Sequence, residues 1–198
     1  MKRITTIFLI TTFLLILTSC SSGSSANYPL NGIWAGVLET EYQRIKISLA
    51  FIDDLCFAFN ETEFGTDTER MSYTYMNGKG TLSSTNNFEV EFTVEDDSLN
   101  YTVDGRNLLL KKDTESDPAP DVIKGVWRDA ENIRFLAFVN DKVFMSNGRI
   151  NTYGIFNFFD NEGFFITVRP QFHAEFVVTG SEMEAVINNS FYKFERKE

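Results

Sequence analysis

The sequence is poor in the residues from which most catalytic and metal sites are built. It has one histidine, His173, and two cysteines, Cys20 and Cys56. One imidazole and two thiols exclude the usual zinc sites of histidine and cysteine ligands. A glycine-rich phosphate loop, a serine nucleophile with partners and an H-E-x-x-H pattern are also missing. We therefore expect a protein that is not an enzyme and that binds no cofactor or metal ion.

The few reactive side chains fit structural roles. His173 lies beside Phe172 and Phe176, where an imidazole is more often a structural or surface residue than a general base. Cys56 stands in the alternating apolar run Leu55–Phe59, without a basic neighbour that would activate a thiol. We expect a buried, unreactive thiol, and with Cys20 assigned below to a lipid no disulfide within the chain.

Two acidic pairs, Asp53–Asp54 and Asp96–Asp97, offer the oxygen ligands that calcium prefers. They lack a loop of regularly spaced ligands, and aspartate is favoured at turns by its local hydrogen bonds. We interpret both pairs as turns. A hydrolase with two facing carboxylates stays open as the least favoured alternative, because spacing along the chain does not show which carboxylates face each other.

The chain has fewer basic than acidic residues. There are 18 Lys and Arg against 28 Asp and Glu, which gives a net charge of −10 at pH 7. An acidic surface repels phosphate groups, so nucleic acid is not expected as a partner. The same charge disfavours contact between the folded body and anionic lipid.

Aromatic residues are abundant, with 20 Phe, 7 Tyr and 2 Trp. They favour strands and a packed core, and no helical period is found. Tight turns divide residues 32–112 into about eight short strands and residues 125–197 into about eight more. Asn77-Gly78 predicts a type I′ hairpin, and Asn161–Gly163 another turn. The clearest alternation predicts that one face of a strand buries Phe88, Val90, Phe92 and Val94.

A short stretch occurs twice, as Gly32-Ile33-Trp34 and as Gly125-Val126-Trp127. Leu49–Asp54 is echoed by Leu136–Asp141, and Leu108–Lys112 by Phe191–Glu195. The matched order indicates a duplicated unit. The expected organisation is a signal peptide at 1–19, a tether at 20–30, a first barrel repeat at 31–112, an acidic proline-containing linker at 113–124 and a second barrel repeat at 125–198.

The N-terminus has the pattern of an export signal. Lys2 and Arg3 precede the apolar run Ile7–Leu17, which is short for a bilayer-spanning helix. The run ends in Leu17-Thr18-Ser19-Cys20, which resembles the bacterial lipobox. The resemblance implies cleavage before Cys20, a diacylglycerol on its thiol, an amide-linked acyl chain such as palmitate, and attachment to a membrane. Ser21 stands where an Asp would resemble an inner-membrane retention signal, which favours the outer membrane.

Gly32-x-Trp34 and Gly125-x-Trp127 resemble the G-x-W signature of lipocalins and related small up-and-down barrels. The resemblance implies that each Trp plugs one end of a barrel and is covered by a basic residue of the last strand. The positions available are Lys111 or Lys112 in the first unit and Lys193 or Arg196 in the second. Only Asn60–Arg70 offers a counterpart to the long omega loop of that family. Because the units are much shorter than a lipocalin, we expect Phe side chains to fill them.

The fold class we expect is all-β, with two tandem small antiparallel up-and-down, lipocalin-like β-barrels. The expected function is a membrane-anchored, non-catalytic binding or interaction module at the bacterial cell envelope, with a protein partner. An alternative is carriage of a small apolar ligand inside a barrel. An architectural alternative, in which all strands pair across the linker into one sandwich or larger barrel, also stays open.

Overall fold

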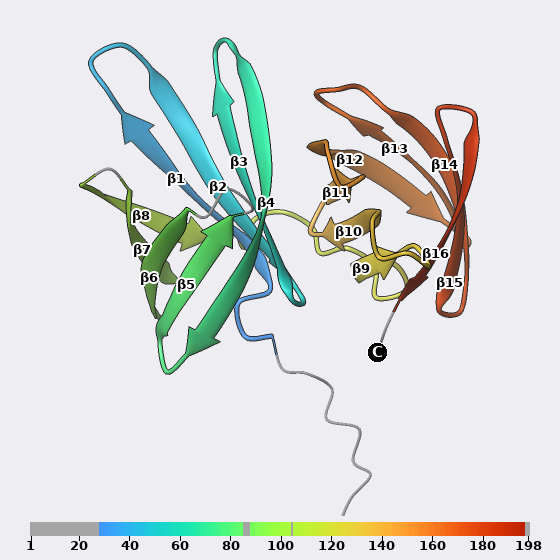
Figure 1. Ribbon diagram of the computed structural model, residues 1–198, viewed down its shortest axis with the longest axis horizontal. Helices are drawn as coiled ribbons and strands as arrows, with labels where there is room; N and C mark the ends of the chain where they lie inside the picture. The colour runs from blue at the N-terminus through green and yellow to red at the C-terminus, as the bar shows by residue number, and fades with distance from the viewer. Residues whose placement is uncertain (1–27, 85–87, 104, 197–198) are drawn as a thin grey trace, which may run out of the picture.

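The computed structural model describes residues 28–84, 88–103 and 105–196, and their regular structure is entirely β-strand. Cys20 and the rest of the predicted signal lie outside these residues. Two closed antiparallel barrels follow each other along the chain (Figure 1). Within each barrel, strands that are adjacent in sequence are adjacent in the sheet. The prediction of two tandem up-and-down barrels is therefore confirmed, and the single sandwich or shared barrel is excluded.

The first barrel closes where Trp34 of its first strand pairs with Lys112 of its last. Its strands are β1 (Gly32–Glu39), β2 (Arg44–Ile52), β3 (Leu55–Thr62), β4 (Gly65–Met76), β5 (Lys79–Ser84), β6 (Glu89–Glu95), β7 (Ser98–Val103) and β8 (Arg106–Lys112). The β4–β5 hairpin turns at Asn77 and Gly78, whose φ angles are 52° and 81°. Positive φ at both positions is the geometry that a type I′ turn requires.

The second barrel repeats this closure, since Trp127 pairs with Arg196. Its strands are β9 (Gly125–Arg128), β10 (Phe135–Val139), β11 (Lys142–Ser146), β12 (Asn151–Phe159), β13 (Glu162–Thr167), β14 (His173–Thr179), β15 (Glu182–Ile187) and β16 (Ser190–Arg196). The last strands, β8 and β16, occupy equivalent places, as the repeat predicted. The predicted alignment within them is wrong by one residue: Lys112 is equivalent to Arg196, so Leu108–Lys112 corresponds to Tyr192–Arg196 and not to Phe191–Glu195.

Three further local predictions are wrong. Asn60–Arg70 is no loop: β3 and β4 extend into a hairpin whose tip is at Glu63 and Phe64. Sequence periodicity did not show these strand ends because polar residues occupy both faces there. Phe88, predicted to be buried, is 44% exposed. It lies before the first residue of β6, so the alternation of that strand does not include it.

The third wrong prediction concerns the turn at Asn161–Gly163. The turn lies at Asp160 and Asn161, with φ of 48° and 70°, and Gly163 belongs to β13. A Cβ at Gly163 would lie 2.3 Å from the ring of Phe176, so glycine is needed there for packing.

Side chains fill the interior of both barrels. The first interior contains Trp34, Phe51 and Phe92, and the second contains Trp127 and Phe176, all with at most 2% exposure. Eight strands are about the number whose enclosed space side chains just fill. Phe side chains therefore act here as core, as the short repeats predicted.

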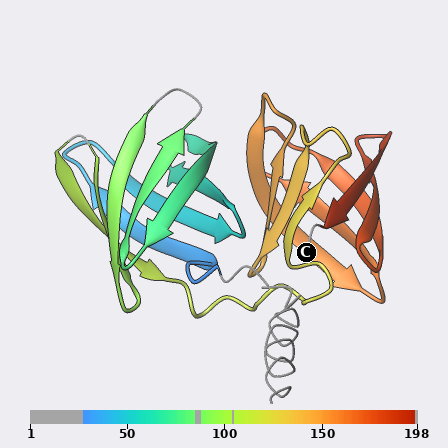
Figure 2. The same ribbon diagram turned by 60° about the horizontal axis from the view of Figure 1, so that its bottom comes forward.

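The connection between the barrels runs along one end of the molecule (Figure 2). No strand is found in residues 113–124, but Ala119 and Ile123 are buried in the core of the second barrel. Leu30, at the end of the predicted tether, is likewise buried in the first core. Each barrel thus has a buried apolar residue four positions before its Trp.

A third apolar core joins the outer walls of the two barrels. The first barrel contributes Ile33, Ala50, Ile52, Leu55, Phe57 and Phe59, and the second contributes Val126, Phe135, Ala137, Val139, Phe144 and Tyr153. Phe57 and Phe144 are equivalent in the repeat and stack on each other, with ring centroids 5.0 Å apart and planes at 25°. Contact between equivalent residues is the mark of an isologous interface, so an approximate twofold axis relates the barrels.

Candidate functional site

The two predicted plug residues lie in the barrel cores. The indole N–H of Trp34 donates to the carbonyl of Leu30 at 3.0 Å, and that of Trp127 donates to the carbonyl of Ile123 at 2.7 Å. Each indole thus has the partner that a buried N–H needs. The backbone residue in each case is the buried apolar one that precedes the barrel.

Lys112 and Arg196 are the basic residues that cover the indoles. The Lys112 ammonium lies 5.5 Å from the Trp34 ring centroid, and the Arg196 guanidinium 5.3 Å from that of Trp127. The other two candidates point outward: Lys111 donates to Ser98, and Lys193 pairs with Glu184. Successive side chains of a strand point to opposite faces, which is why Lys112 and Arg196 reach the indoles whereas Lys111 and Lys193 do not.

The structure places the other singled-out residues apart from one another. His173 is exposed on the outer wall, whereas Cys56 is fully buried, and this burial raises the pKa of its thiol. Asp53 is held in a turn, where its carboxylate accepts from the side chain of Asn31 and from the N–H of Val126. Within residues 28–84, 88–103 and 105–196, no cluster of three or more His, Cys, Asp or Glu is placed to hold a metal ion.

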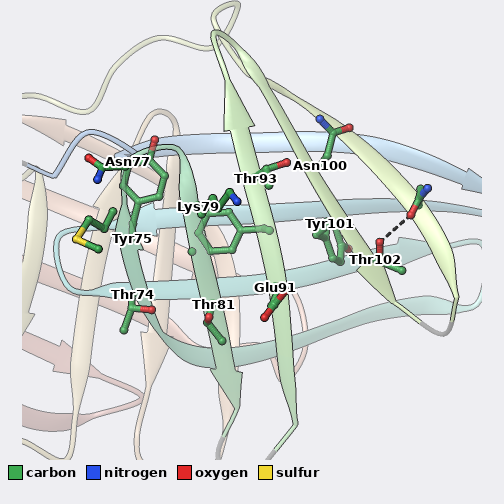
Figure 3. Close-up of a pocket in the computed structure, with 14 residues that line it drawn as sticks. Thr74, Tyr75, Asn77, Lys79, Thr81, Glu91, Thr93, Asn100, Tyr101 and Thr102 are labelled. Atoms are coloured by element: carbon green, nitrogen blue, oxygen red, sulfur yellow. Dashed lines mark hydrogen bonds between the residues drawn. The ribbon is translucent and has the colours of Figure 1, made fainter.

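A polar hollow of about 1200 Å³ lies on the outside of the first barrel, over β4–β8 (Figure 3). Its outward side chains are mainly hydroxyls and amides, namely Thr74, Thr81, Thr93, Asn100, Thr102 and Asn107. The charged residues that line it are Lys79 and Glu91. We call the outward residues of β4–β8 the first outer face.

The equivalent wall of the second barrel, β12–β16, can be aligned through its interior. A Cβ at Gly80 would lie 2.3 Å from the ring of Phe92, just as one at Gly163 would from Phe176. The ring of Tyr75 is parallel to that of Phe92, with centroids 6.1 Å apart. Phe158 repeats this stacking on Phe176 at 5.9 Å. These three positions therefore align the two walls, although other interior residues differ, such as Tyr101 in the first barrel and Ala185 in the second.

The outward residues of this wall, which we call the second outer face, are different. Thr81, Thr93, Thr102 and Asn107 of the first barrel correspond to Phe164, Val177, Val186 and Phe191 of the second. Met76 corresponds to Phe159, and Glu91 to Glu175. Phe159 is 75% exposed, Phe191 57% and Phe164 51%. Where the first barrel has hydroxyls and an amide at four of these positions, the second has exposed apolar side chains on the same arrangement of strands.

The second outer face is hollowed in two places, of about 560 and 660 Å³. Phe164, Glu175 and Val186 line both hollows, so they join into one concave surface. The face points away from the first barrel, and the two outer faces lie at opposite ends of the molecule (Figure 1). Apolar patches of this kind on a folded domain usually mark an interaction site.

The periodicity of the sequence did not indicate this exposed apolar surface. The pairs Phe164-Phe165, Val177-Val178 and Val186-Ile187 place apolar residues on both faces of a strand. Such runs look like strands buried on both sides, and nothing in one strand shows that the outer side is bare. A position-by-position comparison of the two repeats would have revealed the polar-to-apolar exchange.

A smaller apolar pocket of about 180 Å³ lies in the second barrel. Its apolar lining includes Met145, Phe172, Ile187 and Phe194, and Arg134 and Arg149 also line it. The Arg134 guanidinium already pairs with Asp129 at 3.0 Å and lies over the ring of Tyr192. Ligand pockets commonly measure about 300–1000 Å³, so this one suits only a small molecule.

Among the residues that the structure describes, no helix is long and apolar enough to cross a bilayer. Comparison of the chain with models of protein families, with curated proteins and with solved structures gives no match.

Proposed function

We propose that this chain is a lipid-anchored bacterial lipoprotein whose barrels form a non-catalytic binding module at the cell envelope. The lipobox-like sequence ending at Cys20, and the serine-rich stretch after it, support the anchor. Ser21 after Cys20 favours the outer membrane. The Trp residues with their covering Lys112 and Arg196 favour a lipocalin-like relationship.

The second outer face carries this proposal. Its exposed Phe159, Phe164 and Phe191 cost solvation energy in the free protein, and the barrel does not need them, since the first barrel has no Phe at these positions. A partner that covers the face would recover that energy. Because side chains fill both interiors, binding at the outer wall is favoured over binding inside a barrel.

The anchor is tested by Cys20→Ser in a bacterial host supplied with a labelled fatty acid. We expect the native chain to carry the label and to sediment with membranes, and the variant to do neither. Label retained by the variant would reject lipidation at Cys20.

The binding role is tested by a photo-crosslinking amino acid at position 164 or, as a matched control, at position 81. We expect one defined protein adduct from position 164 and none from position 81. Equal adducts from both, none from either, or turnover of a substrate by the purified chain would contradict the proposal.

The pocket of the second barrel favours a second candidate, a carrier of a small apolar ligand. Its apolar lining would suit a small apolar molecule, and Arg149 would suit an anionic end on that molecule. Native mass spectrometry of the purified chain should then show an added small mass, which Phe194→Trp should reduce by filling the pocket. An empty native protein would remove this candidate.

A further inference from the structure

We infer that the second outer face binds a basic, amphipathic polypeptide segment of a partner protein. The inference rests on the proposed binding role and goes further, because it names the chemistry of the partner. It is drawn from the pattern of apolar and acidic side chains on the face.

Carboxylates are interleaved with the exposed apolar side chains. Glu175 lies between Phe164 and Val186 in the register of β13, β14 and β15. In the neighbouring row, Glu162 lies between Phe159 and Val177. A partner that covers the aromatic rings must therefore also cover these carboxylates.

Within residues 28–84, 88–103 and 105–196, these two carboxylates form no ion pair. Lys193 pairs with Glu184 at 2.7 Å, but in the described part of the chain no basic group lies within 4.0 Å of Glu162 or Glu175. A buried carboxylate without a cation is costly, so an uncharged apolar partner would bind poorly. Lysine or arginine placed next to apolar side chains satisfies both features of the face.

The same carboxylates argue against two other occupants. A second copy of this chain, related by a twofold axis, would bring like charges together across the contact. Anionic lipid would meet the same repulsion. A basic peptide segment is attracted where both of these are repelled.

The comparison of the barrels strengthens the assignment. Lys79 and Asn100 of the first outer face correspond to Glu162 and Glu184 of the second. The second face is therefore both more apolar and more acidic than its counterpart. Neither change is required by the barrel, because the first barrel closes without them.

The test uses the chain from residue 21 onward, which holds both barrels, and a short fluorescent peptide of alternating leucine and lysine. Fluorescence anisotropy measures binding. A leucine-glutamate peptide tests the contribution of charge, and a serine-lysine peptide tests the contribution of apolar contact. We expect the leucine-lysine peptide to bind at least about tenfold more tightly than either of these two control peptides. Its binding should weaken as salt is added.

Two variants locate the site. The triple variant Phe164→Thr, Val186→Thr and Phe191→Asn introduces the residues that the first barrel has at these positions, and it should abolish binding. Glu175→Gln leaves every apolar contact in place and should weaken binding by about tenfold. Glu91→Gln, the matched change on the first outer face, should have no effect.

Other outcomes would overturn the inference. Equal binding of the acidic peptide, or no change on Glu175→Gln, would exclude charge recognition. Stronger binding to vesicles of phosphatidylglycerol, or self-association abolished by the triple variant, would assign the face to lipid or to a second copy. If the leucine-lysine peptide fails while position 164 still crosslinks to a protein in cells, this inference falls and the binding role stands. If both fail, both proposals fall.

Discussion

The carboxylate of Asp53 in the first barrel accepts a hydrogen bond of 2.9 Å from the backbone N–H of Val126 in the second. Asp53 lies in the turn after β2, and this turn is held by Asn31, which donates to the Asp53 carboxylate at 3.2 Å. Asp53 thus ties the turn after β2 of the first barrel to the start of β9 in the second.

Asp53→Ala should loosen the contact between the barrels. It leaves the N–H of Val126 without its partner, which we expect to lower the free energy of unfolding by about 1–3 kcal/mol. Asp96→Ala is the matched control, because Asp96 has nearly the same φ, 51° against 52°, in an exposed turn. Chemical denaturation of both variants measures the difference. An equal loss in the two would show that only turn strain is involved.

The stacked pair Phe57 and Phe144 should couple the two barrels energetically. Phe57→Leu and Phe144→Leu each remove one ring, and a double-mutant cycle should give a coupling energy of about 0.5–1.5 kcal/mol. Phe138 lies in the interior of the second barrel, outside this shared core. Phe57→Leu combined with Phe138→Leu should therefore be additive. A coupling near zero for the stacked pair would contradict the interface.

The two cations over the indoles should differ in importance. Arg196 also donates to the carbonyls of Asp121, Val122 and Lys124, whereas Lys112 makes only the ring contact among the described interactions of its side chain. We expect Arg196→Met to cost about 1 kcal/mol more than Lys112→Met in thermal or urea unfolding. Equal losses would mean that the backbone contacts of Arg196 contribute nothing.

Acid should remove a contribution that Asp129 makes to stability. Burial raises the pKa of Asp129, but the N–H groups of Arg134 and Ile133 and the charge of Arg134 outweigh this and leave the pKa below its usual value. A lowered pKa in the folded state stabilises the protein above the ordinary aspartate pKa, and this stability is lost as the pH falls through the folded value.

The corresponding variant is Asp129→Asn. At neutral pH it should lower the free energy of unfolding by about 1–2 kcal/mol, and this difference from the native chain should shrink below about pH 4. Glu131→Gln, an exposed neighbour, serves as the control and should show neither effect. A difference that stays constant down to low pH would exclude ionisation of Asp129 as the cause.

Much of the fold could be predicted from the sequence because the local signals agree. Asn77-Gly78 fixes a hairpin, strands alternate, and Gly-x-Trp recurs at the start of each barrel. The hairpin tip at Glu63 and Phe64 could not be predicted, since both faces of its strands are polar. Gly163 was predicted to lie in a turn, but it is required within a strand because it packs against Phe176. That contact could not be read from the local sequence, since Phe176 lies in another strand.

The surfaces were harder to predict than the strands. Phe57 and Phe164 both point out of their barrels. Phe57 is covered by the second barrel, whereas Phe164 is exposed. Sequence alternation gives only the side of the strand on which a residue lies. Which outer wall is covered depends on how the barrels pack, and that packing is set by contacts between residues far apart in the chain.

The binding role of the second outer face is tested most directly by the rate of thiol labelling in intact cells and in purified protein. Val186→Cys reports on the second outer face and Thr102→Cys on the equivalent position of the first, while buried Cys56 should stay unlabelled in both settings. If a partner covers the second face, position 186 should label at least about tenfold more slowly in cells than after purification, and position 102 should label equally in both. Equal labelling of position 186 in cells and in purified protein would contradict a bound partner.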